Sequence, residues 1–258
     1  MNAVSKTMIA ASIAAASMFS TAASAAPFNE FTVNPIGNYA DFKADKITGN
    51  YTETATFNDD GTFNVSLRWR AGQFVGDGGN VAYEAWQTGL GAVYGLYATY
   101  TATGTFSTAN GITTFLFTPG ADSSLNLYLD NLNGNASDDT LLASGDPLSG
   151  EGTLNPGLST CSATGGINCG SFGASSTFQL TEAGAGFFVA PNPFYNLTFQ
   201  SGQLNNFIPT GTQTINGSLD VVFSGLPDGE VPEPASVGLL GLGMLGLYAA
   251  RRRNKKAA

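Results

Sequence analysis

The stretch from Thr62 to Trp69 reads TFNVSLRW, with an apolar residue at every second position. Side chains of a β-strand alternate between its two faces, so this stretch predicts a strand with one buried face. Ile47 to Phe57 has the same alternation, and the turn sequence Asp59-Asp60-Gly61 lies between the two. Together the two stretches predict a β-hairpin.

Other stretches are rich in Thr, Phe, Tyr and Val and are punctuated by Gly, Asn, Asp or Pro, which predicts more strands. They cover residues 93–106, 113–118, 124–130, 177–181, 186–189, 195–199 and 213–223. Residues 79–90 predict a short helical turn, and the Gly/Ser-rich residues 144–176 predict a long loop. The pattern predicts one all-β domain over residues 26–230, a single β-sandwich of jelly-roll-like type.

The N-terminus has the pattern of an export signal. Lys6 precedes the apolar stretch Met8 to Phe19, and Ala23-Ser24-Ala25 forms a small-residue cleavage site. Residues 1–25 therefore predict a helical signal peptide that signal peptidase removes after Ala25. The alternative is a buried N-terminal helix of the mature protein, which the flanking charge and the cleavage site disfavour.

The C-terminus has three parts in residues 231–258. Pro232-Glu233-Pro234 comes first, a Gly/Leu-rich apolar run over 236–250 follows, and residues 251–256 form a basic end that includes Arg251, Arg252 and Arg253. The run predicts a short membrane helix, although about 20 residues make a comfortable span. The basic end places the tail on the cytoplasmic side of the membrane, so the body of the chain lies outside.

This tail resembles the PEP-CTERM sorting signal of Gram-negative bacteria, with Pro232, Glu233 and Pro234 as the sorting motif. The resemblance implies that an exosortase cuts near the motif and passes the protein from a transient inner-membrane anchor to the cell surface or the extracellular matrix. A removable tail leaves the mature protein without a membrane span. The alternative is a single-pass anchor that is never cut.

The body between the two ends is strongly acidic. Four basic residues, Lys43, Lys46, Arg68 and Arg70, stand against 19 acidic residues between Glu30 and Glu233, a net charge of about −15. Such a charge repels nucleic acid and anionic membranes, so no nucleic-acid partner is expected. It favours solubility and attracts divalent cations, and solubility alone is a sufficient explanation.

Two cysteines, Cys161 and Cys169, lie close together in the Gly/Ser-rich region. In an exported protein such a pair predicts a disulfide. Zinc binding is disfavoured because the chain has no histidine and two cysteines do not make a structural site. The spacing also differs from the C-x-x-C pattern of redox motifs.

The absence of histidine excludes a Ser-His-Asp triad and histidine-ligated metals. A glycosidase needs only two carboxylates, and Glu53, Glu84 and Glu182 are candidates, but nothing in the sequence pairs them. Trp69 and Trp86 could stack on sugar rings, although Trp69 stands at an alternating strand position that favours the core. The sequence therefore predicts no catalytic residue and favours a protein that is not an enzyme.

The segment 130–139 crowds oxygen-bearing side chains after a predicted strand. The candidate ligands for Ca²⁺, the one cofactor considered, are Asp130, Asn133, Asn135, Asp138 and Asp139. The segment departs from the EF-hand pattern, because Leu132 occupies a ligand position and no Glu closes the loop. Since turns rich in Asp and Asn are common in β-proteins, a purely structural turn is the favoured alternative.

The N-terminal part of the body resembles the flocculation-associated PEP-CTERM proteins of floc-forming bacteria. The matching segments are 31–35 (FTVNP), 44–53 (ADKITGNYTE), 61–63 (GTF) and 69–75 (WRAGQFV), and 127–130 and 139–145 are compatible with them. The resemblance implies that the protein holds cells together within an extracellular polysaccharide, its expected partner. It supplies no catalytic residue.

Three classes of function stay open on the sequence. The favoured one is an exported surface or matrix protein that promotes cell aggregation. The second is a carbohydrate- or calcium-binding extracellular module, and the third is an extracellular hydrolase. A strip of exposed aromatic rings would favour the second class, and a carboxylate pair in a cleft would favour the third.

Overall fold

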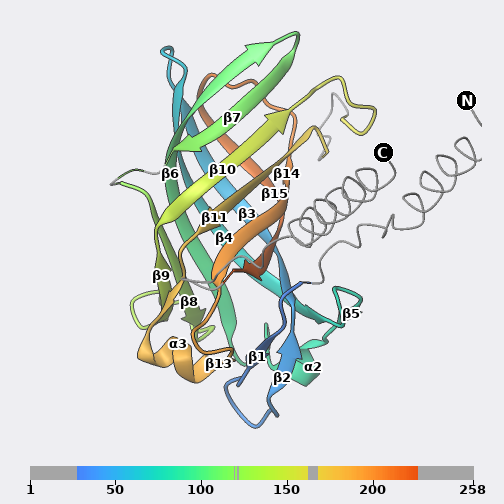
Figure 1. The fold of residues 1–258 in the computed structure, drawn as a ribbon, viewed down its shortest axis with the longest axis vertical. Coiled ribbons are helices and arrows are strands. Elements are labelled where there is room, and N and C mark those ends of the chain that lie inside the picture. Colours follow the sequence, from blue (N-terminus) through green and yellow to red (C-terminus); the bar gives the residue numbers. More distant parts are fainter. Residues whose placement is uncertain (1–27, 119, 121, 162–167, 226–258) are drawn as a thin grey trace, which may run out of the picture.

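The computed structural model describes residues 28–118, 120, 122–161 and 168–225, which form fifteen strands and two short helices. Most strands belong to one large antiparallel sheet (Figure 1). Its strands are β3 (Lys46–Phe57), β4 (Thr62–Gly76), β5 (Val81–Ala82), β6 (Gly95–Ala109), β7 (Ile112–Thr118), β8 (Ser124–Asp130), β9 (Thr140–Gly145), β10 (Pro147–Leu154), β11 (Gly170–Ser176), β12 (Gln179–Leu180), β14 (Asn196–Leu204) and β15 (Gly211–Ser224). The all-β prediction is confirmed.

The hairpin predicted from residues 47–69 is the centre of this sheet. Strands β3 and β4 pair over their full shared length, with Glu53 opposite Leu67 and Phe57 opposite Phe63. The turn between them is stabilised by Asp60, whose Oδ1 accepts a hydrogen bond from the Thr62 backbone N–H at 2.9 Å. Gly61 adopts a φ of 80°, a conformation that glycine reaches without steric cost.

The large sheet closes on itself through β6. One side of β6 pairs with β4, and its other side pairs with β8 over Gly95–Thr101 and with β7 over Thr103–Ala109. The expected β-sandwich of jelly-roll-like type is therefore corrected to a single closed sheet. Alternation reveals which face of each strand is buried, but both arrangements bury one face, so periodicity alone does not distinguish them.

Three of the strand positions around the closed sheet are each occupied by two short strands that follow one another along the chain. Strand β7 is followed by β8, β9 by β10 and β11 by β12, so that the ring has eight strand positions. The interior is filled mainly by aromatic and aliphatic side chains, and Trp69 is fully buried with its indole N–H donating to the Leu219 carbonyl at 2.9 Å. The closed sheet thus encloses the core of the domain.

The loop predicted over residues 144–176 is wrong for most of its length, because β10 and β11 lie within it. Glycine hides the alternation there. Gly150 and Gly152 stand at inward positions of β10, and a Cβ on Gly152 would lie 3.0 Å from the Cβ of Phe172. Glycine thus leaves room for an aromatic side chain of the neighbouring strand. The inward positions of β10 therefore lack the bulky apolar residues that would reveal a strand in the sequence.

A small second sheet covers one end of the closed sheet, at the bottom of Figure 1. It consists of β13 (Phe188–Ala190), β1 (Phe31–Val33) and β2 (Phe42–Ala44), with the helices α2 (Ala85–Thr88) and α3 (Glu182–Phe187) nearby. Phe31 packs edge-on against Phe223 of β15 with ring centroids 4.9 Å apart, which joins the two sheets. The short helix predicted within 79–90 is confirmed as α2, whereas the strand predicted over 186–189 begins only after α3.

Candidate functional site

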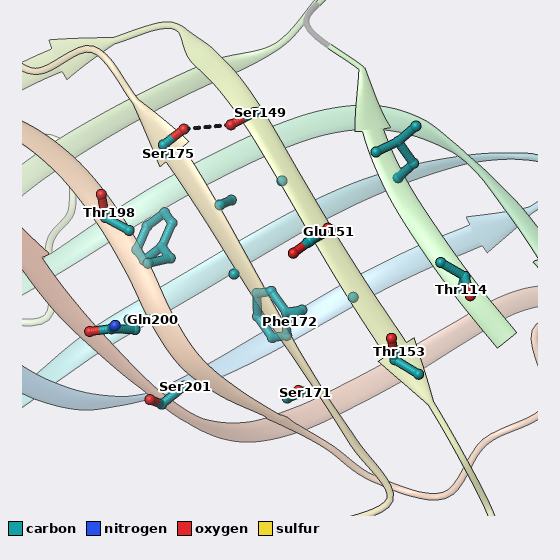
Figure 2. A pocket seen from close by; sticks show the side chains of 16 residues that line it. Thr114, Ser149, Glu151, Thr153, Ser171, Phe172, Ser175, Thr198, Gln200 and Ser201 are labelled. Atoms are coloured by element: carbon teal, nitrogen blue, oxygen red, sulfur yellow. Dashed lines mark hydrogen bonds between the residues drawn. The ribbon is translucent and has the colours of Figure 1, made fainter. Parts of the chain in front are cut away.

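A shallow groove of about 590 Å³ lies on the outer face of β7, β10, β11 and β14 (Figure 2). Outward-facing side chains on these strands are short and polar. They comprise Thr114 of β7, Ser149, Glu151 and Thr153 of β10, Ser171 and Ser175 of β11, and Thr198, Gln200 and Ser201 of β14. Leu116 is the exposed apolar residue among them.

The groove exists because the alternation of β11 separates large from small side chains. Phe172 points inward and is buried, whereas Ser171 and Gly173 face outward and fill little space. The hydroxyls of Ser149 and Ser175 hydrogen-bond across the strand pair at 2.7 Å, as Figure 2 shows. Short outward side chains between taller neighbours leave a hollow lined with hydroxyl groups.

A bulge in β14 adds polar groups to one wall of the groove. The register between β11 and β14 shifts between Phe172 and Ala174, and Ser201 has a φ of 57°. An extra residue in one strand directs two consecutive side chains to the same side. Gln200 and Ser201 are accordingly both exposed on the groove side.

The groove is equipped for hydrogen bonding. Serine and threonine hydroxyls both donate and accept, and the Gln200 amide adds two donors and an acceptor. Phe172 and Phe199 lie beneath the surface, so the lining presents no exposed aromatic face on which a sugar ring could stack. Glu151 is the single carboxylate in the lining, so the groove lacks the pair that glycoside hydrolysis uses.

The three glutamates considered for catalysis lie in different parts of the molecule. Glu53 faces the interior of the closed sheet, where it is 6% exposed. Glu84 is the N-cap residue of α2, and its backbone N–H donates a hydrogen bond to the side-chain Oε1 of Gln87 at 2.8 Å. Glu182 is exposed in the first turn of α3. The structure brings no two of them together.

The two tryptophans differ completely in environment. Trp69 is part of the core, in agreement with its alternating position in the sequence. Trp86 is 76% exposed on α2, which places it outside the groove. An isolated exposed tryptophan is compatible with a role in binding, but it does not form the aromatic strip that would favour a dedicated carbohydrate-binding module.

The candidate calcium ligands lie together in the turn after β8, where they serve the turn itself. The Oδ1 atom of Asp130 accepts from the Leu132 backbone N–H at 2.7 Å, and Asn133 donates to Asp138 at 2.7 Å. Asp139 accepts from the Tyr97 hydroxyl at 2.8 Å. Asn135 accepts from the Ser137 hydroxyl. Among the described residues no three Asp, Glu or Cys side chains are grouped so that they could hold a metal, and calcium binding stays a prediction.

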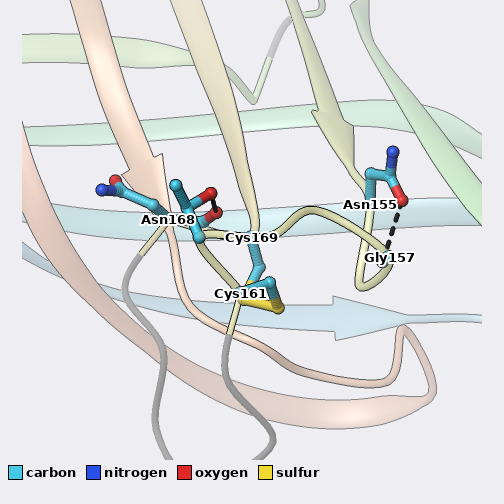
Figure 3. Close-up of a disulfide and its surroundings, with 6 residues drawn as sticks. Asn155, Gly157, Cys161, Asn168 and Cys169 are labelled. Carbon is cyan, nitrogen blue, oxygen red and sulfur yellow. Dashed lines mark hydrogen bonds between the residues drawn. A yellow bond between two sulfur atoms is a disulfide. The ribbon is translucent and has the colours of Figure 1, made fainter.

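The predicted disulfide between Cys161 and Cys169 is present, with a Cα–Cα distance of 4.4 Å (Figure 3). It lies in the connection between β10 and β11, immediately before the strand that forms the groove floor. The backbone N–H of Asn155 donates to the Cys169 carbonyl at 2.6 Å, and the Thr160 hydroxyl donates to the Asn168 carbonyl at 2.8 Å. The disulfide and these bonds hold the two strand ends together.

The few basic side chains of the described residues are mostly engaged. Lys43 forms an ion pair with Glu30 at 2.6 Å, and this partner raises the pKa of Lys43 through a hydrogen bond and its charge. Lys46 pairs with Asp220 at 3.2 Å, and the Arg68 guanidinium lies 4.1 Å from the centre of the Tyr97 ring. The remaining acidic side chains leave the surface strongly negative.

The signal peptide with Ala23 and Ala25, the motif Pro232-Glu233-Pro234, the tail helix and Arg251 to Arg253 lie outside the described residues. Within the described part of the chain, neither helix is long or apolar enough to cross a membrane. The predicted functions of both ends are therefore not tested by the geometry.

The fold and the groove together define an all-β protein with a closed sheet and a polar outer surface. No curated protein and no solved structure matches the chain. Residues 230–253, however, match the family model of the PEP-CTERM protein-sorting motif. The chain thus carries a PEP-CTERM sorting motif, and the motif implies an extracellular or cell-surface protein processed by an exosortase.

None of the groove residues was predicted from the sequence as part of a binding site. Ser149, Glu151, Ser171 and Ser175 fall in the segment interpreted as a loop. The alternation of Phe172 and Ala174 with small polar residues in β11 was the available signal, but it covers only a few residues and is weakened by Gly173.

Proposed function

We propose that the mature protein is a non-enzymatic component of the extracellular matrix that promotes cell aggregation, or flocculation, by binding exopolysaccharide in the groove. The sorting motif at residues 230–253 supports an extracellular location. The groove supports the ligand class, because its hydroxyl and amide groups match the hydroxyl-rich surface of a polysaccharide. The resemblance of residues 31–75 to flocculation-associated proteins supports the biological role.

The observation that carries the proposal is the hydroxyl-lined groove on four neighbouring strands. Adjacent strands lie about 4.8 Å apart, so the groove extends roughly 14 Å across the sheet. Such a surface suits a short stretch of a linear sugar chain held by direct and water-mediated hydrogen bonds. Many weak sites of this kind on a protein-rich matrix produce a large total affinity by multivalency.

Processing follows from the two ends of the chain. We propose that signal peptidase cuts after Ala25 in a Gram-negative cell. The tail over 236–250 then anchors the precursor in the inner membrane until an exosortase cuts near Pro232-Glu233-Pro234. A variant truncated before Pro232 should reach the periplasm and fail to appear on the cell surface, which cell fractionation and immunoblotting would detect.

Divalent cations offer a second way to link cells. The body has a net charge of about −15, and the turn with Asp130, Asp138 and Asp139 contributes three of its carboxylates. Calcium bound there or along the acidic surface would bridge the protein to acidic polysaccharide. Under this proposal EDTA disperses flocs and calcium restores them, whereas flocs that resist EDTA exclude bridging by cations and leave the groove as the binding surface.

The deciding experiment removes the gene and scores settling and aggregation after complementation. The wild-type gene should restore aggregation, and Ser171→Tyr should not, because the tyrosine fills the groove from an exposed outward position. The matched control is Thr54→Tyr on the outer face of β3, outside the groove. Normal aggregation of the deletion strain would refute the proposal.

A further inference from the structure

The closed sheet contains a small cavity at the end away from the second sheet. Six phenylalanine side chains line it, together with Val65, Leu204, Ile215 and one charged residue, Glu53. Its volume is about 20 Å³, which is space for a single water molecule. Strands β7, β11 and β14 contribute to both the cavity and the groove, and Phe172 lies between the two.

Glu53 is the anomaly of this interior. The residue is 6% exposed, and its carboxylate has no hydrogen-bond or ion-pair partner among the described residues. Burial raises the pKa of Glu53 to about 7. The hydroxyl of Tyr100, which senses the charge of Glu53, is also buried without a hydrogen-bond partner among the residues described. A buried carboxylate without a partner opposes folding, and the interior of the fold does not need one.

Phe207 closes the cavity. It lies in the loop between β14 and β15, and its ring stacks on Phe57 with centroids 5.8 Å apart and on Phe115 at 6.1 Å. Strands β14 and β15 pair with each other only between residues 196–200 and 220–224, although each pairs with its other neighbour, β11 or β3, up to the ends of the loop. The next residue, Ile208, is 72% exposed. Phe207 is thus the one residue of the cavity lining that lies in a loop and not in a strand, so its ring is the part of the lining most able to move.

We propose that this cavity is a binding site for a small aryl amine, which enters when Phe207 moves outward. The ring of the ligand takes the place of the Phe207 ring on Phe57 and Phe115, and its ammonium group forms an ion pair with Glu53. Surrounding phenyl rings add cation–π attraction. The ligand supplies what the closed cavity lacks, a partner for the Glu53 carboxylate.

This inference is independent of the groove and of the role in aggregation. The groove faces solvent and presents hydroxyl groups, whereas the cavity faces the core and presents phenyl rings with one carboxylate. A failure of amine binding would leave the polysaccharide proposal unaffected, and normal aggregation in the deletion strain would leave the amine site unaffected.

The test is calorimetric titration of the protein purified from the medium of the producing cells. Benzylamine is the probe, and benzyl alcohol is the neutral control of the same shape. Benzylamine should bind at least tenfold more tightly than benzyl alcohol, because only the amine pairs with the carboxylate. Glu53→Gln should remove this preference, whereas Glu151→Gln, which changes the exposed carboxylate of the groove, should retain it.

Phe207→Ala tests the entrance without changing Glu53. It should bind benzylamine about tenfold more tightly than the wild-type protein and keep the preference over benzyl alcohol, because no ring has to be displaced. Ile208→Ala is the control in the same loop and should match the wild-type protein. Absence of benzylamine binding in both the wild-type protein and Phe207→Ala, or equal binding of the two probes in Phe207→Ala, would overturn the proposal.

Discussion

The outer and inner faces of β10, β11 and β14 belong to the same strands but have opposite chemistry. The outer face presents hydroxyl groups and the exposed carboxylate of Glu151, whereas the inner face presents the phenyl rings of Phe172 and Phe199 and the glycines of β10. On the inside of β3, which β15 separates from β14, Glu53 is almost completely buried. Alternation along the strands therefore builds two candidate binding surfaces. Removing the Glu53 carboxylate from water destabilises the inner one, whereas the exposed Glu151 carboxylate at the outer one carries no such penalty.

The largest effect is expected from removing the side chain of Phe172, which lies between the outer and inner faces. Phe172→Ala should lower the free energy of unfolding by about 3–5 kcal/mol, because Phe172 is buried and packs edge-on against Tyr51 at 5.3 Å. Urea denaturation measures the change. Leu116→Ala is the control on the outer face and should change stability by less than about 0.5 kcal/mol. Equal losses in the two variants would contradict the assignment of inner and outer faces.

The two carboxylates should respond differently to pH. Burial raises the pKa of Glu53 in the folded protein to about 7, above its ordinary value of 4.5, so the folded state holds the proton more tightly than the unfolded state. Stability should fall as pH rises from about 4.5 through 7, by roughly 3 kcal/mol in total. The neighbouring hydroxyls of Tyr51 and Tyr100 have raised pKa values and stay neutral in this range.

Glu53→Gln should therefore lose less stability than the wild-type protein between pH 5 and pH 8, measured as the urea midpoint at each pH. Glu151→Gln should follow the wild-type curve, because Glu151 is exposed at every pH. Parallel curves for all three proteins would show that Glu53 is solvated in solution.

The disulfide should have a smaller effect, confined to the ends of β10 and β11. Replacing both Cys161 and Cys169 with alanine should lower stability by about 2 kcal/mol, because the cross-link closes a short loop. Thermal unfolding of the double variant measures the loss, and reduction of the wild-type protein should reproduce it. A double variant as stable as the wild-type protein would show that the backbone hydrogen bonds around Asn155 hold these strand ends without the cross-link.

The smallest effect on stability is expected for the groove itself. Ser149→Ala removes an exposed hydrogen bond to Ser175 and should change the free energy of unfolding by less than about 0.5 kcal/mol. Polysaccharide retention should nevertheless weaken in an affinity electrophoresis experiment, since the hydroxyl lies in the lining. A stability loss above 1 kcal/mol would mean that this hydroxyl pair supports the sheet and not a ligand.

The sequence identified the strands where bulky apolar residues alternate with polar ones, as in β3, β4 and β8. It failed where glycine replaces the bulky partner, because other strands fill the space, with Phe117 beside Gly150 of β10 and Phe172 and Phe115 beside Gly152. Closure of the sheet through β6 is a long-range pairing, and no local pattern encodes it.

Individual site residues were predictable to the extent that their chemistry is local. The disulfide followed from two nearby cysteines, and the sorting motif followed from a contiguous segment. The groove depends on four strands that are brought side by side only by folding. The inward position of Glu53 was visible in the alternation of residues 47–57, but its loss of solvent contact depends on the phenylalanines of other strands.

The scarcity of lysine has a practical consequence for any binding measurement. Lys43 and Lys46 are the two lysines among the described residues; Lys43 lies in β2 of the second sheet, and Lys46 is the first residue of β3. The side chain of Lys43 is 66% exposed, whereas that of Lys46 is 18% exposed. Of these two lysines, Lys43 should therefore be the one that amine-reactive coupling to a sensor surface modifies, and its place in β2 leaves the groove on β10 and β11 accessible to a soluble polysaccharide.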